Sequence, residues 1–134
     1  MTDILDDIAE HLDDGVVAGG STAWRIFKGF MPPSPDRVIV ILPTGSDEPD
    51  GDNSGATEYA FPRFQVTVRC DARGMQEARA KALQVWIALQ NSTPRIDYVF
   101  VFALQSEFFL VQYDQNDRPE LSCNFRVMRS QQTS

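Results

Sequence analysis

The sequence is poor in the residues that most catalytic and metal sites require. Its 134 residues include one histidine, His11, and two cysteines, Cys70 and Cys123, which do not form a CxxC pair. A lone histidine without a second ligand supplies neither a zinc site nor a Ser-His-Asp triad, and we expect it to be solvated or to cap a helix. Both cysteines fall in strand-like runs, so we expect reduced core residues. GxGxxG, P-loop and GxSxG motifs are missing as well. We therefore predict no catalytic, cofactor-binding or metal-binding residue.

Long apolar runs and an excess of positive charge are also missing. No stretch approaches the 20 apolar residues of a membrane span, which excludes a membrane protein of that kind. The first 15 residues lack the basic region of a signal peptide, so we expect an intracellular chain. Twelve Lys and Arg against nineteen Asp and Glu give a net charge of −7. Surfaces that grip duplex DNA are basic, so we expect DNA only as cargo that passes the protein.

The chain does contain enough apolar material for one core. Hydrophobic residues make up 43% of it, with 9 Phe, 3 Tyr and 2 Trp. A chain of 15.1 kDa buries about two-thirds of its surface on folding, which needs neither disulfide nor metal. We expect one domain over residues 1–134.

Periodicity predicts two helices and six strands in this domain. Apolar residues recur at helical spacing in two segments, and the other runs alternate or are apolar throughout. The mixed order and short links favour an α+β fold: a mostly antiparallel or mixed sheet of five to six strands packed by two helices. A long mobile loop is expected over 44–58 and a short flexible tail over 130–134. The expected helices are 2–14 and 75–90, and the expected strands are 23–30, 37–42, 62–71, 96–104, 107–113 and 121–128.

The expected loop carries a cluster of acids, Asp47, Glu48, Asp50 and Asp52. The fixed register of an EF-hand is not met, so the cluster predicts a solvated loop tip rather than a calcium site. These four residues are our candidates for a loop that meets a partner.

The apolar residues exceed what one side of a small sheet can hide. Leu83 and Ile87 form a second stripe on the expected second helix, displaced from its main stripe. Either helices cover both faces of the sheet, or neighbouring copies bury the surplus. Arginines on the polar sides of two strands are expected to form ion pairs within or between subunits. The candidate interface residues are Trp24, Phe27, Leu83, Ile87, Arg63, Arg69 and Arg126.

The ordered series of segments resembles the tail terminator (tail completion) and minor capsid proteins of long-tailed bacteriophages. The resemblance rests on the short first helix, Met31-Pro32-Pro33-Ser34-Pro35-Asp36 before an apolar strand, and the variable loop. The Phe61–Arg69 strand, an Ala-rich helix and the run from Tyr113-Asp114 through Arg118 to Val127 complete it.

The resemblance implies a non-enzymatic structural protein of the virion, located at the head–tail junction and assembled in the host cytoplasm. Such proteins form a ring, commonly a hexamer, that caps the tail tube and joins it to the head connector. The implied partners are copies of the chain itself, the tail tube protein and the head connector protein, with no membrane and no cofactor. Three alternatives remain open: a head-side connector protein, a small ligand-binding or enzymatic α+β domain, and a regulatory module without a ring.

Overall fold

The computed structural model describes residues 4–12, 24–47, 57–90 and 98–132. These residues form two helices and one six-stranded mixed sheet, which confirms the predicted α+β class. In chain order the elements are α1 (Ile4–Leu12), β1 (Arg25–Lys28), β2 (Val38–Asp47), β3 (Thr57–Arg69), α2 (Met75–Leu89), β4 (Tyr98–Ala103), β5 (Phe109–Tyr113) and β6 (Pro119–Gln132).

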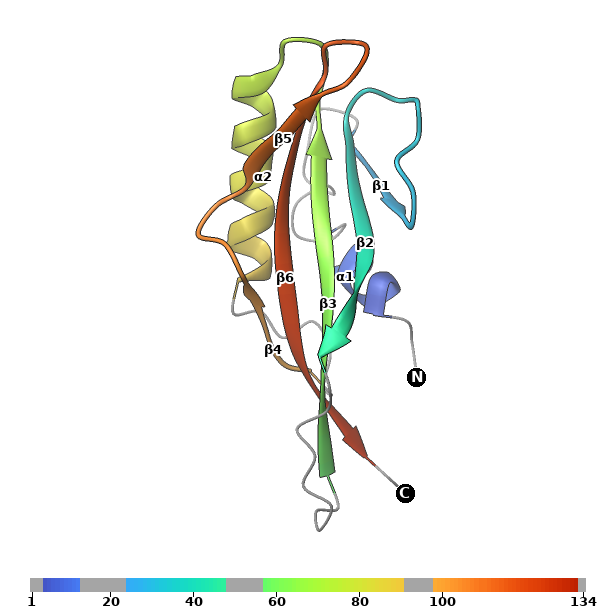
Figure 1. Cartoon of the computed structure of the whole chain (residues 1–134), viewed down its shortest axis with the longest axis vertical. Helices are drawn as coiled ribbons and strands as arrows, with labels where there is room; N and C mark the ends of the chain where they lie inside the picture. The colour runs from blue at the N-terminus through green and yellow to red at the C-terminus, as the bar shows by residue number, and fades with distance from the viewer. Residues whose placement is uncertain (1–3, 13–23, 48–56, 91–97, 133–134) are drawn as a thin grey trace.

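The sheet is built around the long pair β3 and β6 (Figure 1). Its order is β1-β2-β3-β6-β4, and β5 pairs with β6 on the same side as β4. β1 is parallel to β2, whereas all other pairs are antiparallel. β1 therefore lies at one edge of the sheet, and β4 and β5 lie at the other.

The core lies on one face of this sheet. In β3, Phe64, Val66 and Val68 alternate with polar residues, so all three side chains project to the same side. Their cross-strand partners in β6 are Phe125, Cys123 and Leu121. Phe64 and Phe125 stack with their ring centroids 5.3 Å apart.

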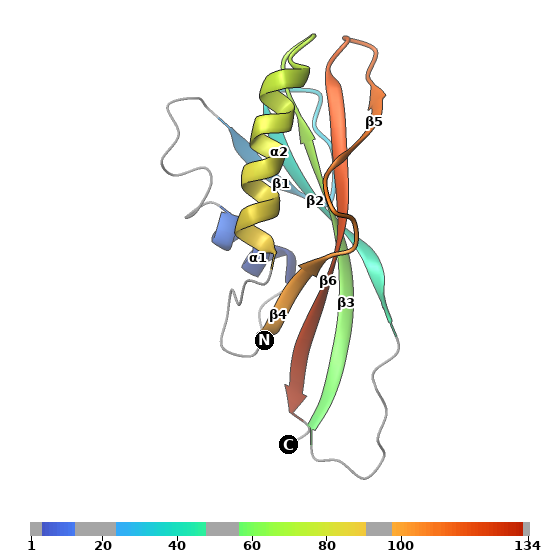
Figure 2. The same cartoon turned by 90° about the vertical axis from the view of Figure 1, so that its left-hand side faces the viewer.

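Both helices pack on this face (Figure 2). Ile8 and Leu12 of α1 join Ala82, Val85 and Leu89 of α2 in one buried cluster with the strand residues above. The small alanine side chains of α2 allow the helix to approach the sheet closely. The sequence left two explanations for the surplus apolar residues. The one that places helices on both faces of the sheet is wrong for the described residues.

The opposite face, called here the outer face, is covered in part by an irregular segment rather than by a helix. Val38 and Val40 of β2 point to this face and are fully buried. The Met31–Asp36 segment between β1 and β2 is fastened to it through Arg69, as described below. Three prolines deprive the segment of backbone N–H donors, so it cannot extend the sheet as a strand.

Two sequence-based boundaries are wrong. β2 continues to Asp47 and β3 begins at Thr57, so the predicted loop 44–58 is too long at both ends. β6 continues to Gln132, so most of the predicted flexible tail 130–134 is strand. Both errors have one cause: polar residues in the extended ends of the β2–β3 and β3–β6 pairs are held by strand pairing rather than by an alternating apolar pattern.

Candidate assembly surfaces

An apolar stripe on α2 faces away from the core. Leu83 is 59% exposed and Ile87 is 64% exposed, whereas Val85 and Leu89 of the same helix are fully buried. Leu83 and Ile87 are four residues apart and therefore lie one turn apart on the same side of α2. They face solvent because the principal apolar stripe of the helix packs against the sheet.

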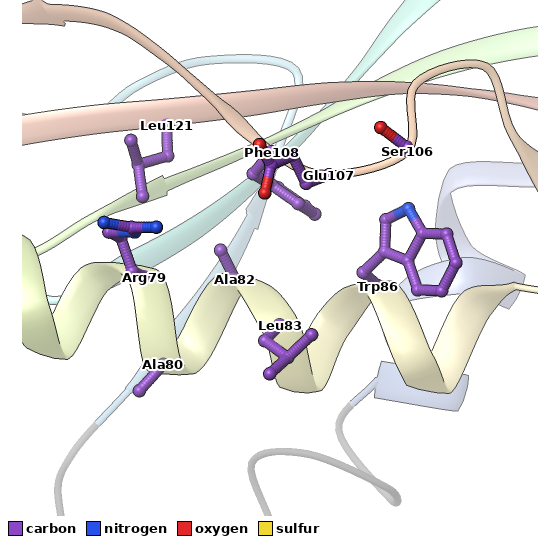
Figure 3. A pocket seen from close by; sticks show the side chains of 9 residues that line it. All are labelled: Arg79, Ala80, Ala82, Leu83, Trp86, Ser106, Glu107, Phe108 and Leu121. Atoms are coloured by element: carbon purple, nitrogen blue, oxygen red, sulfur yellow. The ribbon is translucent and has the colours of Figure 1, made fainter.

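Beside this stripe, a groove of about 310 Å³ separates α2 from the segment that joins β4 to β5. Leu83 and Trp86 line it on the helix side, and Glu107 and Phe108 line it on the other (Figure 3). The Trp86 Nε1–H donates to the Gln105 carbonyl at 3.1 Å, which holds the indole against this segment. Leu83 thus belongs both to the exposed stripe and to the wall of this groove.

β5 is exposed along its whole length. It pairs with β6, and no other described strand pairs with it. Phe109, Leu110 and Val111 are all well exposed, and register shifts between Leu110 and Gln112 mark a bulge at Val111. An exposed apolar edge strand offers both side chains and backbone hydrogen-bonding groups to a partner.

The opposite edge, β1, differs in charge. Among the described strands β1 pairs with β2 alone. Arg25 and Lys28 are exposed at its two ends, and Lys28 forms an ion pair with Asp6 of α1. Phe27 is half-buried and packs edge-on against the exposed Phe30, with ring centroids 5.8 Å apart. The β1 edge therefore carries positive charge, whereas the β5 edge is apolar.

Two arginines fasten the Met31–Asp36 segment to the outer face. Arg69 is 2% exposed, and its guanidinium donates to the carbonyls of Pro32 at 2.7 Å, Pro35 at 2.6 Å and Asp36 at 3.2 Å. Arg118 donates to the Pro33 carbonyl at 2.9 Å. The fork of guanidinium donors supplies the bonds that a proline-rich segment cannot make with its own backbone.

The pKa values of the two arginines shift in opposite directions. Desolvation by burial, together with the nearby Arg118 charge, lowers the pKa of Arg69. Desolvation also acts to lower the pKa of Arg118, but hydrogen bonds to Asp114 and Asp36 outweigh it and raise that pKa. Both groups stay charged at neutral pH, because the arginine guanidinium is a very strong base. Arg69 thus has a structural role within the subunit, and its part in a subunit interface stays a prediction.

The other two predicted arginines lie opposite each other on the outer face, Arg63 in β3 and Arg126 in β6. Both are half-buried, and the Arg126 guanidinium carbon lies 5.8 Å from the centroid of the Phe102 ring. Next along the ladder, Gln65 donates to Asn124 at 3.2 Å, and the Thr67 and Ser122 hydroxyls are 2.7 Å apart. Their part in a subunit interface stays a prediction.

The remaining predicted residues divide by burial. Trp24 is 4% exposed and belongs to the core of the subunit, where Lys81 Nζ lies 5.4 Å from its ring centroid; its part in an interface stays a prediction. Phe27 is accessible at the β1 edge. Asp47 ends β2, and Glu48, Asp50 and Asp52 lie outside the described residues.

Two other groups connect distant parts of the chain. Half-buried His11 has the capping role that was one of its two predicted roles: its Nε2 lies 2.9 Å from the Ala88 carbonyl in the last turn of α2, where it satisfies an end carbonyl of that helix. The sequence gives no local signal for the hydrogen bond from Arg118 to the Pro33 carbonyl, because 85 residues separate the two. Cys70 and Cys123 are free and buried, as predicted, and desolvation raises the pKa of Cys123 to about 11.

Metal ligands and membrane-spanning helices are the remaining features that the described residues bear on. No group of three or more His, Cys, Asp or Glu side chains among them could hold a metal ion. Within the same ranges, no helix is both long and apolar enough to cross a membrane.

Comparisons with known proteins give one family match and a match to a solved fold. No curated protein matches the chain. A solved structure described as the virion of a native gene transfer agent particle contains a chain with the same fold: the TM-score is 0.64, the identity is 22%, and 96% of this chain and 95% of that chain are covered. The family model described as "Bacteriophage tail terminator protein" matches residues 8–130. The chain therefore belongs to the bacteriophage tail terminator family and is a structural protein of the virion.

Proposed function

We propose that the protein forms a ring on the end of the tail tube, stops the growth of the tube and provides the surface that joins it to the head connector. Family membership supports the tail location. The observation that carries the ring is the placement of exposed apolar groups: Leu83 and Ile87 on α2 and the apolar residues of β5 lie toward one edge of the sheet. An isolated domain gains nothing from exposing them, so we assign them to contacts with other subunits.

The contact between subunits is head-to-tail in this proposal. The apolar β5 edge and the basic β1 edge lie at opposite ends of the sheet, so one surface of a copy meets a different surface of the next (Figure 1). Head-to-tail contacts generate a closed ring when the rotation between copies closes. We propose a hexamer, the number common in the family that the sequence resembles.

The proposed role requires no catalytic step. The buried arginines Arg69 and Arg118, together with Asp114 and Asp36, hold one segment against the sheet. DNA enters only as cargo that passes through the ring, and the acidic composition disfavours its retention.

The test uses tail tubes grown from purified tube protein with and without this chain. We expect the chain to shorten the length distribution of the tubes and to add a ring at one end, visible by electron microscopy. Heads carrying the connector are then expected to bind only the tubes that have rings. Tubes of unchanged length, with the chain attached to isolated head connectors instead, would overturn the proposal in favour of a head-side protein.

A further inference from the structure

We propose that neighbouring copies in the ring join their sheets, with β1 of one copy pairing antiparallel to the free edge of β5 in the next. This inference rests on the proposed ring and adds which strands form the contact and in which register. The occupant of the exposed β5 edge is therefore a second copy of this chain.

Strand direction is the first argument. β1 is parallel to β2, and three successive antiparallel pairings connect β2 through β3 and β6 to β5. β1 therefore runs antiparallel to β5 within one sheet. A copy related by rotation about an axis along the strands keeps its strand directions. It would present its β1 antiparallel to β5, which is the commoner and more stable type of pairing.

The second argument is that the β1 edge has backbone groups to offer. The Arg25 N–H donates to the Arg37 carbonyl, and the Gly29 N–H donates to the Ile41 carbonyl. Backbone groups alternate between the two sides of a strand, so those of Ile26 and Lys28 point to the open side of β1. Addition of a strand at such an edge gains main-chain hydrogen bonds in addition to side-chain contacts.

The third argument is that one register matches the side chains on both faces. Strand pairing places Arg25 and Phe27 on the outer face with Val38 and Val40, and Ile26 on the helix face with Ile39. In β5, Phe109 and Gln112 share the outer face with Ser122 and Glu120, and Leu110 shares the helix face with Leu121. These assignments fix which residues of the two edges can meet.

With Arg25 opposite Gln112 and the bulge at Val111 taken into account, Ile26 lies opposite Leu110 and Phe27 lies opposite Phe109. Each apolar pair then falls on one face, and cross-strand pairs of this kind stabilise a sheet by about 0.2–1 kcal/mol each. A slip by one residue would place Ile26 on the wrong face.

Charge complementarity is the fourth argument. Arg25 forms no ion pair among the described residues, and in this register it approaches Glu120, whose Oε1 accepts from Gln112 Nε2 at 3.2 Å. At the other end of the pair, Lys28 comes close to Glu107. Glu107 is exposed and likewise has no ion pair within the described ranges. Two copies of the β5 edge facing each other would bring these acids together instead.

The test is disulfide cross-linking of rings assembled on tail tubes. Arg25→Cys and Gln112→Cys are combined in one chain, because both side chains are exposed and neither replacement disturbs the core. A disulfide requires Cα atoms about 4.4–6.8 Å apart, which a direct cross-strand pair provides. We expect oxidation to give a ladder of covalent multimers up to the full ring, and a second pair, Phe27→Cys with Phe109→Cys, to do the same. The native thiols contribute little background, because both are buried.

Controls separate the register from simple proximity. Each single variant is expected to remain monomeric on a non-reducing gel, because identical edges do not meet in a head-to-tail contact. Arg25→Cys with Phe109→Cys uses the same two edges about two residues out of register, and we expect at most a tenth of the cross-linked product.

The outcomes distinguish this inference from the proposed function. Rings that form on tubes without a cross-link at either matched pair would overturn the strand pairing and leave the ring proposal standing. Pairing with a tube-protein strand instead would give a cross-link between each single variant and a cysteine-scanned tube protein, which also overturns it. Tubes that carry no ring with the unmodified chain would overturn both. Thermal unfolding of each variant verifies that its subunit is folded before assembly.

Discussion

Arg118 and Asp36 are in contact although 82 residues separate them in the sequence: Arg118 Nη1 lies 2.9 Å from Asp36 Oδ1. The same guanidinium donates through Nε to Asp114 Oδ2 at 2.7 Å, within its own turn between β5 and β6. One side chain thus connects that turn to the Met31–Asp36 segment. With Arg69 beside it, Arg118 fixes how this segment lies on the outer face.

We therefore expect Arg118→Ala to destabilise the subunit. The replacement removes the side-chain donors to the Pro33 carbonyl and to Asp114 Oδ2, and each such loss costs about 1–3 kcal/mol. The expected total is about 2–4 kcal/mol, or a fall in Tm of roughly 8–15 °C. Thermal unfolding measured by circular dichroism gives the value.

Two variants make this result specific. Arg79→Ala removes an exposed arginine from α2, and its Tm should stay within about 2 °C of the unmodified protein. Arg118→Lys keeps the charge without the planar fork and should lie between the two. An Arg118→Ala protein as stable as Arg79→Ala would show that the contacts of Arg118 contribute nothing.

Acid should weaken the same network through Asp114. Desolvation acts to raise the pKa of Asp114, but bonds from the Arg118 and Asn116 backbone and from the Arg118 side chain lower it overall. The folded-state pKa therefore lies below the unfolded value of about 3.9. The stabilisation is complete well above pH 4 and is lost as the pH falls through the folded-state pKa.

Urea unfolding at pH 7 and pH 3 checks this sign. Asp114→Asn should be less stable than the unmodified protein at pH 7 by about 1–2 kcal/mol, and the difference should shrink at pH 3. Asp117→Asn is the matched control, since Asp117 lies in the same turn at φ 59° and asparagine tolerates that conformation. A difference that grows on acidification would contradict the assigned role of Asp114.

Local pattern predicts the elements here better than it predicts what covers them. Alternation in β3 assigns Phe64 and Val66 to one side and Thr67 and Arg69 to the other, as observed, because strand period depends on backbone geometry alone. The same alternation suggests that Arg69 is accessible. It is buried because the Met31–Asp36 segment, more than 30 residues earlier, lies over it.

The assembly surfaces also combine features that local pattern predicts with features that depend on non-local contacts. Leu83 and Ile87 could be recognised as a second stripe because helix period is local, and both are exposed. The exposure of β5 could not be derived from its apolar sequence, since it depends on β5 being at an edge. That position follows from β6 pairing with β3 on one side and with β4 and β5 on the other, which are non-local contacts.

The stripe on α2 gives a prediction about assembly. Leu83→Asp and Ile87→Asp should each leave the subunit folded, because both side chains are mostly exposed. Burial of a leucine at an interface is worth about 1.5–3 kcal/mol, so each variant should weaken ring formation by roughly tenfold or more. Sedimentation with tail tubes measures the assembly, and Tm measures the fold.

Gln84→Asp places the same charge on the same helix beside the stripe, at an exposed position, and should assemble normally. Val85→Asp places it in the core and should unfold the subunit. If Leu83→Asp behaves like Val85→Asp, the stripe belongs to the subunit core and the interface assignment fails.

The last prediction concerns the acids between β2 and β3. If Asp47, Glu48, Asp50 and Asp52 line the channel of the proposed ring, they keep passing DNA from binding to its wall. Charges more than about 8 Å apart are largely screened at physiological salt, so only acids at the wall act in this way. Replacement of all four by Asn or Gln should leave particle assembly intact but slow DNA release, most clearly at low salt.

Neutralising Glu10, Asp13 and Asp14 near α1 removes a similar charge from a different place and should leave release unchanged. Assembly is counted by electron microscopy and release by dye uptake of the ejected DNA. Equal slowing in both sets would mean that net charge alone matters, and tight, salt-sensitive binding of duplex DNA by the unmodified protein would contradict exclusion directly, because it would require a basic surface.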